Sequence, residues 1–258
     1  MPETNHKLLL SEWSVLSLRP QGQHAVAHCA SELRGANFFA CSSMKLEAVE
    51  NDEELKKVLS CHHIIVTSPA AARFAGQSPV FFIPQNSHWF ALGDGSASVL
   101  KKVGVENITR PEHGSNSESL LALPTLQNVQ GKNIGLITAP GGRGLIETIL
   151  LERGANVFVA NMYQRKSLAI SADEIKNLRE LHSPFAVLCS SYEIFQSLWQ
   201  QIDAELKQSL GRGLWIVSSL RLQDLLQQAG ILHISVSTSA QPEAMLAHLQ
   251  HVQTQALR

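Results

Sequence analysis

The sequence of 258 residues predicts an α/β protein built from two similar units. The first observation is an internal repeat, because residues 32–39 return as 151–158 and residues 64–68 return within 186–191. The second is that short apolar runs alternate with helical patterns, several of which end at a glycine. Two α/β units on one chain form a cleft, and small ligands commonly bind between domains.

The first elements set the pattern that the rest of the chain follows. The short apolar run 14–18 predicts a strand, and Pro20 ends it because proline cannot donate to a strand ladder. Residues 22–33 place apolar side chains at helical spacing, which predicts a helix. Gly35 then stands where a glycine commonly ends a helix.

The next elements repeat strand and helix. The β-branched run 64–66 predicts a buried strand, and residues 67–69 start a helix with a capping hydroxyl and an early proline. The apolar run 80–83 predicts another strand, ended by Pro84. A helix is expected over 96–103.

The second half of the chain repeats this alternation, which is typical of parallel sheets covered by helices on both faces. The expected elements are strands over 133–137, 157–159, 186–188, 215–217 and 234–236, and helices over 145–153, 172–181 and 243–252.

Two segments lie at corresponding points of the repeats, just past the strand that follows each Gly-Ala-Asn. They are residues 41–45 and 164–168, and we expect them to be paired crossings between two domains. The first domain is then discontinuous, residues 7–38 with 167–257, and the second is an inserted domain over 42–163.

Composition limits the function classes. The chain is 44% apolar and 17% charged, as in a globular protein, and its formal charge of −1 argues against a nucleic-acid partner. No apolar run is long enough for a membrane span, and the N-terminus does not resemble a signal peptide, so we expect a cytoplasmic protein. The four separated cysteines are expected to be reduced, structural thiols.

A hydroxyl or a glycine recurs at the carboxyl end of the expected strands, directly before a helix. In open α/β sheets, ligands bind at this edge, and the free N–H groups of helix N-termini favour anions there. The alternative is that these residues are ordinary helix caps. The positions are Thr67-Ser68, Gly93 with Ser96, Thr138 with Gly141-Gly142, Ser190-Ser191 and Ser218-Ser219.

For a nucleotide site and for a metal site, the sequence lacks part of the required residue pattern. The glycine-rich loop 139–144 has no P-loop lysine and no dinucleotide spacing, which argues against nucleotide binding. His24 and His28 share a helical face without a third metal ligand, so solvated histidines are favoured over a metal site. We therefore expect neither a metal nor a cofactor.

Tyr163 is one of only two tyrosines and is expected just beyond a strand end. A phenol can donate a proton or a hydrogen bond to a departing oxygen. The alternative is a half-buried aromatic ring whose hydroxyl lies in water.

Taken in order, these motifs resemble the uroporphyrinogen-III synthase family over roughly residues 15–249. The resemblance implies two flavodoxin-like parallel-sheet domains joined by a two-strand linker. It rests on Arg-Pro at 19–20, Thr-Ser-Pro-x-Ala at 67–71, Leu-Gly-x-x-Ser-Ala at 92–97, Gly-Gly-Arg at 141–143, Tyr-x-Arg at 163–165 and Ser-Ser at 190–191.

The resemblance also implies a set of functional residues. Tyr163 becomes the candidate catalytic residue, assisting departure of a hydroxyl group. The expected substrate-binding residues are Arg19, Thr67, Ser68, Ser96, Gly142, Arg143, Ser190, Ser191 and Ser219.

The family's substrate is hydroxymethylbilane, a linear tetrapyrrole with eight carboxylates. The many hydroxyl and backbone N–H donors would bind these carboxylates. The hydroxyl of the substrate's hydroxymethyl group leaves as water, and the resulting carbon electrophile attacks the substituted carbon of the last pyrrole. The spiro intermediate opens and recloses with ring D inverted, in tetrapyrrole (haem) biosynthesis. The resemblance thus implies a cytoplasmic, monomeric lyase that acts on a small molecule without a cofactor, mainly by holding its substrate in one folded shape.

The sequence departs from the family at Ser96, where threonine is usual, and at Leu222, the equivalent position of the second half, where some members have threonine. One alternative is a non-catalytic two-domain protein of this fold that binds a tetrapyrrole or another polyanion. Another is an unrelated doubly wound enzyme or a structural partner in a larger complex.

Overall fold

The computed structural model describes residues 10–114, 116–142 and 144–256, which divide into two compact units. Unit 1 contains the chain up to Leu46 and again from Arg165, and unit 2 is the continuous segment Glu47–Gln164. Of the domain bounds expected above, residues 7–9 and 257 lie outside the described part. No helix in that part has both the length and the apolar character needed to cross a membrane.

Unit 1 is a parallel sheet in which every neighbouring pair of strands runs the same way. Its order is that of a flavodoxin-like sheet, in which the second strand along the chain lies at one edge beside the first. Across the sheet the strands are β12 (Ile234–Val236), β11 (Leu214–Val217), β10 (Phe185–Cys189), β1 (Ser14–Leu18) and β2 (Asn37–Cys41).

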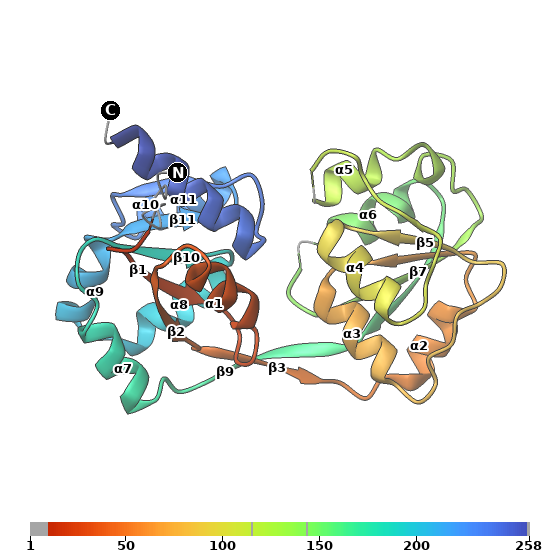
Figure 1. The fold of residues 1–258 in the computed structure, drawn as a ribbon. Helices are drawn as coiled ribbons and strands as arrows, with labels where there is room; N and C mark the ends of the chain where they lie inside the picture. Colours follow the sequence, from red (N-terminus) through yellow and green to blue (C-terminus); the bar gives the residue numbers. More distant parts are fainter. Residues whose placement is uncertain (1–9, 115, 143, 257–258) are drawn as a thin grey trace, which may run out of the picture. The chain divides into compact units, whose positions relative to one another are not determined.

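Helices cover both faces of this sheet (Figure 1). One core layer lies under two helices, α1 (Ala25–Glu32) and α11 (Pro242–Ala256). The opposite layer lies under α7 (Ala172–Arg179), α8 (Tyr192–Gln201), α9 (Ala204–Gly211) and α10 (Leu220–Gln228).

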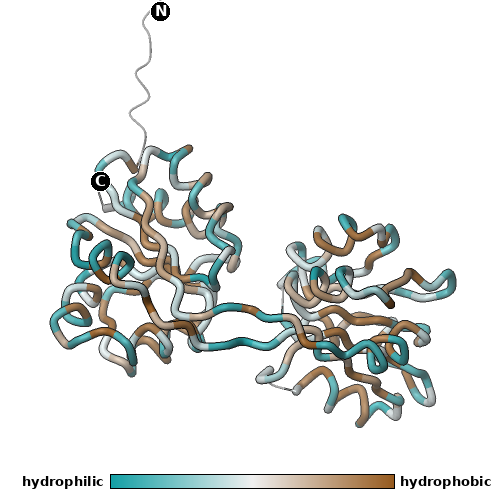
Figure 2. Tube along the Cα trace, turned by 90° about the horizontal axis from the view of Figure 1, so that it is seen from below, coloured by the Kyte–Doolittle hydropathy of each residue, from teal (hydrophilic) through white to brown (hydrophobic). Residues whose placement is uncertain are grey.

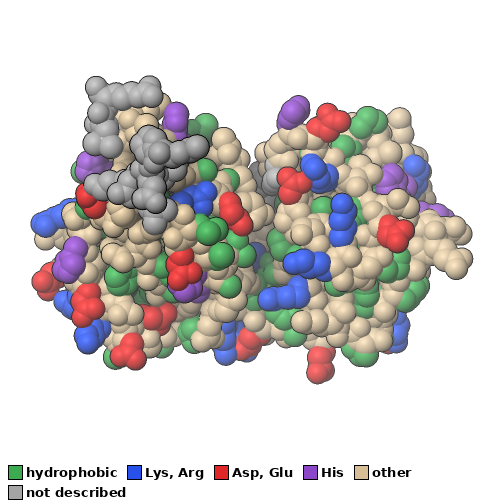
Figure 3. Space-filling view, in the orientation of Figure 1, with side chains coloured by type: hydrophobic (Ala, Val, Ile, Leu, Met, Phe, Trp, Pro, Cys, Tyr) green, Lys and Arg blue, Asp and Glu red, His purple; other side chains and the backbone are tan. Residues whose placement is uncertain are grey.

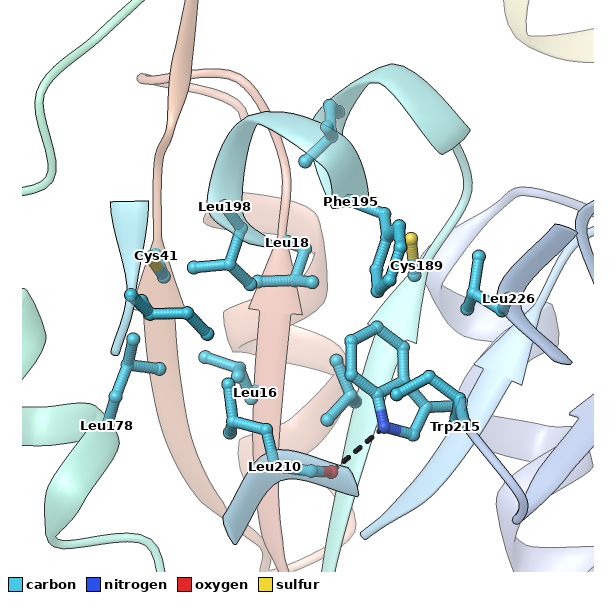
Figure 4. Packing of buried hydrophobic residues seen from close by; sticks show 14 of the residues in the cluster. Leu16, Leu18, Cys41, Leu178, Cys189, Phe195, Leu198, Leu210, Trp215 and Leu226 are labelled. Carbon is cyan, nitrogen blue, oxygen red and sulfur yellow. Dashed lines mark hydrogen bonds between the residues drawn. The ribbon is translucent and has the colours of Figure 1, made fainter. Parts of the chain in front are cut away.

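Trp215 is the largest side chain of the second layer and is fully buried (Figure 4). Its ring lies edge-on to Phe195, with ring centroids 5.6 Å apart. Its indole N–H donates to the carbonyl oxygen of Leu210 at 3.0 Å, which satisfies the one polar group that its burial removes from water. This packing fixes β11 against α8 and α9.

Unit 2 is a second parallel sheet. Across it the strands are β6 (Ile108–Thr109), β5 (His88–Ala91), β4 (His63–Val66), β7 (Asn133–Thr138) and β8 (Asn156–Asn161). One face packs against α5 (Ser117–Leu121), the short 3-10 helix η1 (Pro124–Leu126) and α6 (Leu145–Glu152). The other face carries α2 (Asp52–Leu59), α3 (Pro69–Gln77) and α4 (Asp94–Lys102) (Figure 1).

The two expected crossings form a two-stranded sheet of β3 (Met44–Ala48) and β9 (Tyr163–Ser167). They run antiparallel, since Leu168 donates to Ser43 at one end and Val49 donates to Met162 at the other. Figure 2 shows these strands as mostly hydrophilic, whereas strands inside the two larger sheets are hydrophobic. The expected fold class, two parallel-sheet domains joined by a two-strand linker, is confirmed.

The strand expected over 80–83 is wrong. These residues follow α3 as a turn and an irregular segment, and the strand of this region is β5. Prolines at 79 and 84 flank the run and remove two ladder donors, while Phe82 and Ile83 are 52% and 41% exposed. An apolar run bounded by prolines thus forms a surface loop here.

Candidate functional site at the carboxyl ends of the strands

The parallel register places the carboxyl ends of neighbouring strands at one edge of each sheet. In unit 1, Leu18 of β1 pairs with Cys189 of β10, which pairs with Val217 of β11. In unit 2, Val66 of β4 pairs with Ile137 of β7. The residues that follow these positions therefore lie together within their own unit, where the sequence predicted a ligand site.

Thr67 and Ser68 follow β4 in unit 2, and both hydroxyls have partners. The Thr67 hydroxyl donates to Thr138 Oγ1 at 2.8 Å. Ser68 is the N-cap of α3, and its Oγ accepts the backbone N–H of Ala71 at 3.0 Å. The capping explanation is thus correct for Ser68, and its Oγ also lies 3.2 Å from the phenol oxygen of Tyr163.

Tyr163 is the first residue of β9 and is only 3% exposed. Its ring stacks on Phe74 of α3, with centroids 5.6 Å apart and planes 20° from parallel. The alternative of a half-buried ring with its hydroxyl in water is therefore wrong, because the ring is buried and the hydroxyl lies against Ser68. Unit 2 brings Thr67, Ser68 and Tyr163 together.

Two other helices of unit 2 begin at the same edge without a side-chain cap. The N-cap of α4 is Gly93, and the N-cap of α6 is Gly144, which adopts the left-handed conformation at φ 66°. Uncapped first-turn N–H groups are donors for an anion. Ser96, in the first turn of α4, is 3% exposed.

The loop after β7 holds the remaining candidates of unit 2. A Cβ added at Gly142 meets no atom within 4 Å, so the backbone there is open to close approach by a ligand. Arg143 lies outside the described residues.

In unit 1 the site residues follow three neighbouring strands. Arg19 follows β1, Ser190 and Ser191 follow β10, and Ser219 follows Ser218 at the end of β11. The Ser219 hydroxyl caps α10 by accepting the N–H of Leu222 at 3.3 Å, as the capping explanation predicts. Ser191 is the N-cap of α8 but its side chain makes no capping bond, so the hydroxyl stays available to a ligand.

Arg19 carries a cation whose hydrogen-bond donors are incompletely satisfied. One terminal amine donates to the carbonyl oxygen of Ala240 at 2.8 Å, whereas the buried Nε has no partner. Burial lowers the pKa of the guanidinium, and the negative charge of Glu243 opposes that shift. Because an arginine remains protonated even so, Arg19 suits a carboxylate ligand.

Sequence reasoning missed the role of His24. It is the N-cap residue of α1, and its two ring nitrogens lie 3.1 Å from Ser17 Oγ and 2.9 Å from Ser42 Oγ. The prediction of a solvated histidine is wrong for His24 and correct for His28, whose side chain is 53% exposed. The i, i+4 spacing could not show this, because Ser17 and Ser42 come from β1 and from the segment after β2.

Several cationic side chains lie on the exposed surface of unit 2, and two of them, Lys101 and Lys102, are at the opposite end of α4 from the candidate site. Figure 3 shows Lys and Arg side chains gathered over the face of unit 2 that carries α3 and α4. Arg73 on α3 and Lys101 and Lys102 on α4 are exposed. The described residues contain no cluster of His, Cys, Asp and Glu that could hold a metal ion.

Comparison with known proteins identifies the family. The family model described as "Uroporphyrinogen-III synthase HemD" matches residues 26–247. Uroporphyrinogen-III synthase of Escherichia coli (strain K12) is 33% identical over 168 residues, which is 65% of this chain and 68% of the relative. The Salmonella typhimurium (strain LT2) protein of the same name is 32% identical over the same shares.

Solved structures agree on the fold. A mutant uroporphyrinogen III synthase from the extremely thermophilic bacterium Thermus thermophilus is 17% identical, with a TM-score of 0.59 over 94% of this chain and 99% of that chain. Uroporphyrinogen-III synthetase from Helicobacter pylori 26695 is 14% identical, with a TM-score of 0.61 over 93% and 99%. With its family model matched over most of its length, the chain belongs to the uroporphyrinogen-III synthase family.

Proposed function

We propose that this chain is a uroporphyrinogen-III synthase, a cyclising hydro-lyase of haem biosynthesis that converts hydroxymethylbilane into the type III macrocycle with loss of water. Membership of the family supports the reaction. The observation that carries the proposal at the site is the buried Tyr163 phenol, 3.2 Å from Ser68 at the start of α3. A protonated oxygen at a helix N-terminus suits a step in which an oxygen leaves as water.

The substrate's carboxylates are bound by the donors at the strand ends of both units. In unit 1 these are the Arg19 guanidinium and the hydroxyls of Ser190, Ser191 and Ser219. The incomplete bonding of Arg19 and the missing capping bond of Ser191 support this role, because both leave donors that a carboxylate can use.

In unit 2 the carboxylate donors are the hydroxyls of Thr67 and Ser96 and the loop around Gly142 and Arg143, and the Thr67 hydroxyl turns from Thr138 to the carboxylate when substrate binds. The first-turn N–H groups of α4 and α6 add partial positive charge. Binding of several carboxylates at once restricts the flexible tetrapyrrole to one folded shape. This orientation favours attack at the substituted carbon over the spontaneous closure.

Tyr163 acts as the proton donor. The bond from the hydroxymethyl carbon to oxygen breaks, the electron pair goes to the oxygen, and that oxygen takes the phenol proton and leaves as water. The carbon electrophile attacks the last pyrrole, and the spiro intermediate opens and recloses with ring D inverted. When the pyrrole regains its aromaticity it releases a proton, which restores the phenol.

Freshly prepared hydroxymethylbilane tests the proposal directly. The wild-type protein is expected to form the type III isomer faster than the spontaneous type I product, as measured by chromatography of the oxidised porphyrins. If the protein binds the tetrapyrrole but leaves the product type I, it is a non-catalytic binding protein of this fold and the proposed activity is refuted.

Tyr163→Phe removes the phenol proton and retains the stacked ring. We expect kcat to fall about 100-fold, the lower range for loss of a general acid, with little change in KM. Unchanged turnover in Tyr163→Phe would show that Tyr163 is not the proton donor.

We further propose that the chain works as a monomer in the cytoplasm. Each unit has its own core, and the family's substrate is a small molecule. Sedimentation at micromolar concentration is expected to give the mass of one chain, and a stable dimer would contradict the monomer.

A further inference from the structure

We infer that Ser68 and Phe74 are positioning residues that fix the Tyr163 phenol of unit 2 for proton transfer. This inference rests on the proposed function and adds to it a residue, Phe74, that the sequence motifs do not include. It also changes the role of Ser68, from binding a carboxylate to orienting Tyr163.

Helix α3 supplies both contacts to the phenol. Ser68 is its N-cap, and Phe74 lies on the helix with its ring stacked on Tyr163. The helix itself is fixed on the sheet, because Ala71, Ala72 and Ala75 are buried with exposures of 1% or less. Tyr163 is therefore held by a rigid element at its oxygen and at its ring.

Phe74 restricts the plane of the phenol ring. A tyrosine ring has two main torsions, and a nearly parallel neighbour at 5.6 Å leaves the second torsion little freedom. The Arg73 guanidinium lies 4.7 Å from the Phe74 ring centroid, a cation–π distance that holds Phe74 in turn. The position of the Tyr163 phenol oxygen is thus set by packing before substrate binds.

Ser68 completes the arrangement at the phenol oxygen. Its Oγ accepts the Ala71 N–H, which leaves its own O–H to donate to the phenol oxygen. In that direction the bonds run from backbone N–H to Ser68 to Tyr163, and the phenol keeps its proton for transfer. The same O–H stabilises the phenol oxygen as it gains negative charge, at the positive end of α3.

The internal repeat provides a comparison within the same chain. The residues of unit 1 equivalent to Ser68 and Tyr163 are Ser191 and Met44, each at the same point of its repeat. Met44 is buried and has no hydroxyl, and Ser191 makes no side-chain capping bond. The position equivalent to Phe74 is Ser197, whose hydroxyl donates to the Ser43 carbonyl oxygen at 2.7 Å. Unit 1 therefore has the equivalent helix and strand but no hydroxyl at the position of Tyr163.

Kinetics with two matched pairs of variants tests the inference. Phe74→Leu removes the stacked ring, and Phe81→Leu removes another aromatic contact of unit 2, that with Trp89. Ser68→Ala removes a helix cap together with the phenol contact. Its control, Asn116→Ala, removes only the cap of α5, where Asn116 accepts the Ser119 N–H at 2.8 Å.

Phe74→Leu and Ser68→Ala are expected to lower kcat about 10- to 100-fold with KM within about twofold of wild type, the scale of a misplaced catalytic group. Ser68→Thr, which keeps the hydroxyl, is expected to restore most of kcat. The control variants are expected to retain wild-type kcat. If KM rises while kcat is unchanged, Ser68 binds a carboxylate and the positioning role is overturned.

Carbon-13 NMR of the tyrosine ring gives a readout independent of turnover. The chain has only two tyrosines, Tyr163 and Tyr192, and the signal that disappears in Tyr163→Phe is that of Tyr163. Phe74→Leu is expected to shift the Tyr163 signal and leave that of Tyr192, whereas Phe81→Leu shifts neither. An unmoved Tyr163 signal in Phe74→Leu would show that the two rings are not stacked and overturn the inference.

The two readouts separate this inference from the proposed function. If the wild-type protein forms no type III product, the proposed function is refuted. The contact of Phe74 with Tyr163 then has no catalytic purpose, even if the NMR shift shows that the rings stack. Active wild-type protein whose Phe74 and Ser68 variants match their controls refutes the positioning role alone.

Discussion

His24 links three segments of unit 1 through its ring. The nitrogens contact Ser17 at the end of β1 and Ser42 after β2, and the Ser42 N–H donates to Glu174 of α7 at 2.8 Å. Burial lowers the pKa of His24, and the positive charge of Arg19 lowers it further, while Glu174 opposes both. The folded protein therefore favours the neutral imidazole.

This shift predicts how stability depends on pH. In the unfolded chain His24 takes a proton near its ordinary pKa, about 6.5, whereas the folded protein resists protonation. Between the two pKa values the unfolded state binds more protons, so the free energy of unfolding decreases as pH falls below about 6.5. Half-buried His63 and His248 also have lowered pKa values, mainly through desolvation, and contribute in the same direction.

Replacing His24 by glutamine is expected to reduce this pH dependence, because glutamine keeps a polar side chain but does not titrate. Urea unfolding at pH 7.5 and pH 5.5 measures the difference in free energy for each variant. His28→Gln is the control for replacing a histidine by glutamine at an exposed position of the same helix. Equal pH dependence in His24→Gln and wild type would contradict the account.

The candidate site was predictable from the sequence where a residue follows a strand directly. Thr67, Ser68 and Ser190 fall at strand ends because each comes right after a buried apolar run, and parallel strands align those ends. The contact of Phe74 with Tyr163 was not predictable. It depends on β9 running beside α3, which separates the two residues along the chain and leaves no local pattern.

At the scale of elements, buried strands were the most predictable part. The run at 64–66 is covered by helices on both faces and reads as continuously apolar. Helix α2 was not predicted from the sequence, although it buries Leu55, Val58 and Leu59 on one amphipathic face. Three acidic residues in its first turn and two lysines in its last make it a strongly charged segment that only tertiary packing distinguishes from a loop.

The packing of α2 on β7 predicts the effect of one methyl group. A Cβ added at Gly135 of β7 would lie 2.6 Å from Val58 Cγ1 and 2.7 Å from the Val58 carbonyl oxygen. The second atom is backbone, so the whole helix must shift. We expect Gly135→Ala to lower the free energy of unfolding by about 1–3 kcal/mol, measured by urea denaturation.

Gly211 at the end of α9 supplies the matched control. A Cβ there meets no atom within 4 Å, so Gly211→Ala adds only helix propensity. Its stability is expected to stay within about 1 kcal/mol of wild type and not to fall. If Gly135→Ala is as stable as Gly211→Ala, α2 does not pack closely on β7.

At the scale of the whole molecule, the boundaries of the sequence repeats do not coincide with those of the two compact units. The repeat matches β1 with β7, β2 with β8 and β4 with β10. Yet β1 pairs with β10 in unit 1, and β7 pairs with β4 in unit 2. Each sheet therefore combines the first two sheet strands of one repeat with the last three sheet strands of the other.

The sequence predicted the duplication and the crossings because the repeats share short motifs at nearly constant spacing. The composition of each sheet follows from the linker, since β3 carries the chain out of unit 1 after only two of that unit's strands and β9 returns it. The relative positions of donors from different units do not follow from sequence, because no local pattern records them.

Because each sheet combines strands of both repeats, two fragments of similar length are expected to fold differently. The segment 47–164 contains every strand of the unit 2 sheet and both of its helical layers, so it buries a complete core. A fragment that begins at Leu10 and ends at Leu126 contains one full repeat but breaks both sheets. It leaves β1 without β10 and β4 without β7.

We expect 47–164 to unfold cooperatively in urea, with helical and strand signals in circular dichroism. The repeat fragment is expected to show no cooperative transition, because β1 and β4 each lose a neighbouring strand and part of their helical cover. Cooperative folding of the repeat fragment alone would mean that a repeat can close its own sheet. The exchange of strands between units would then be a late rearrangement and not a requirement of the fold.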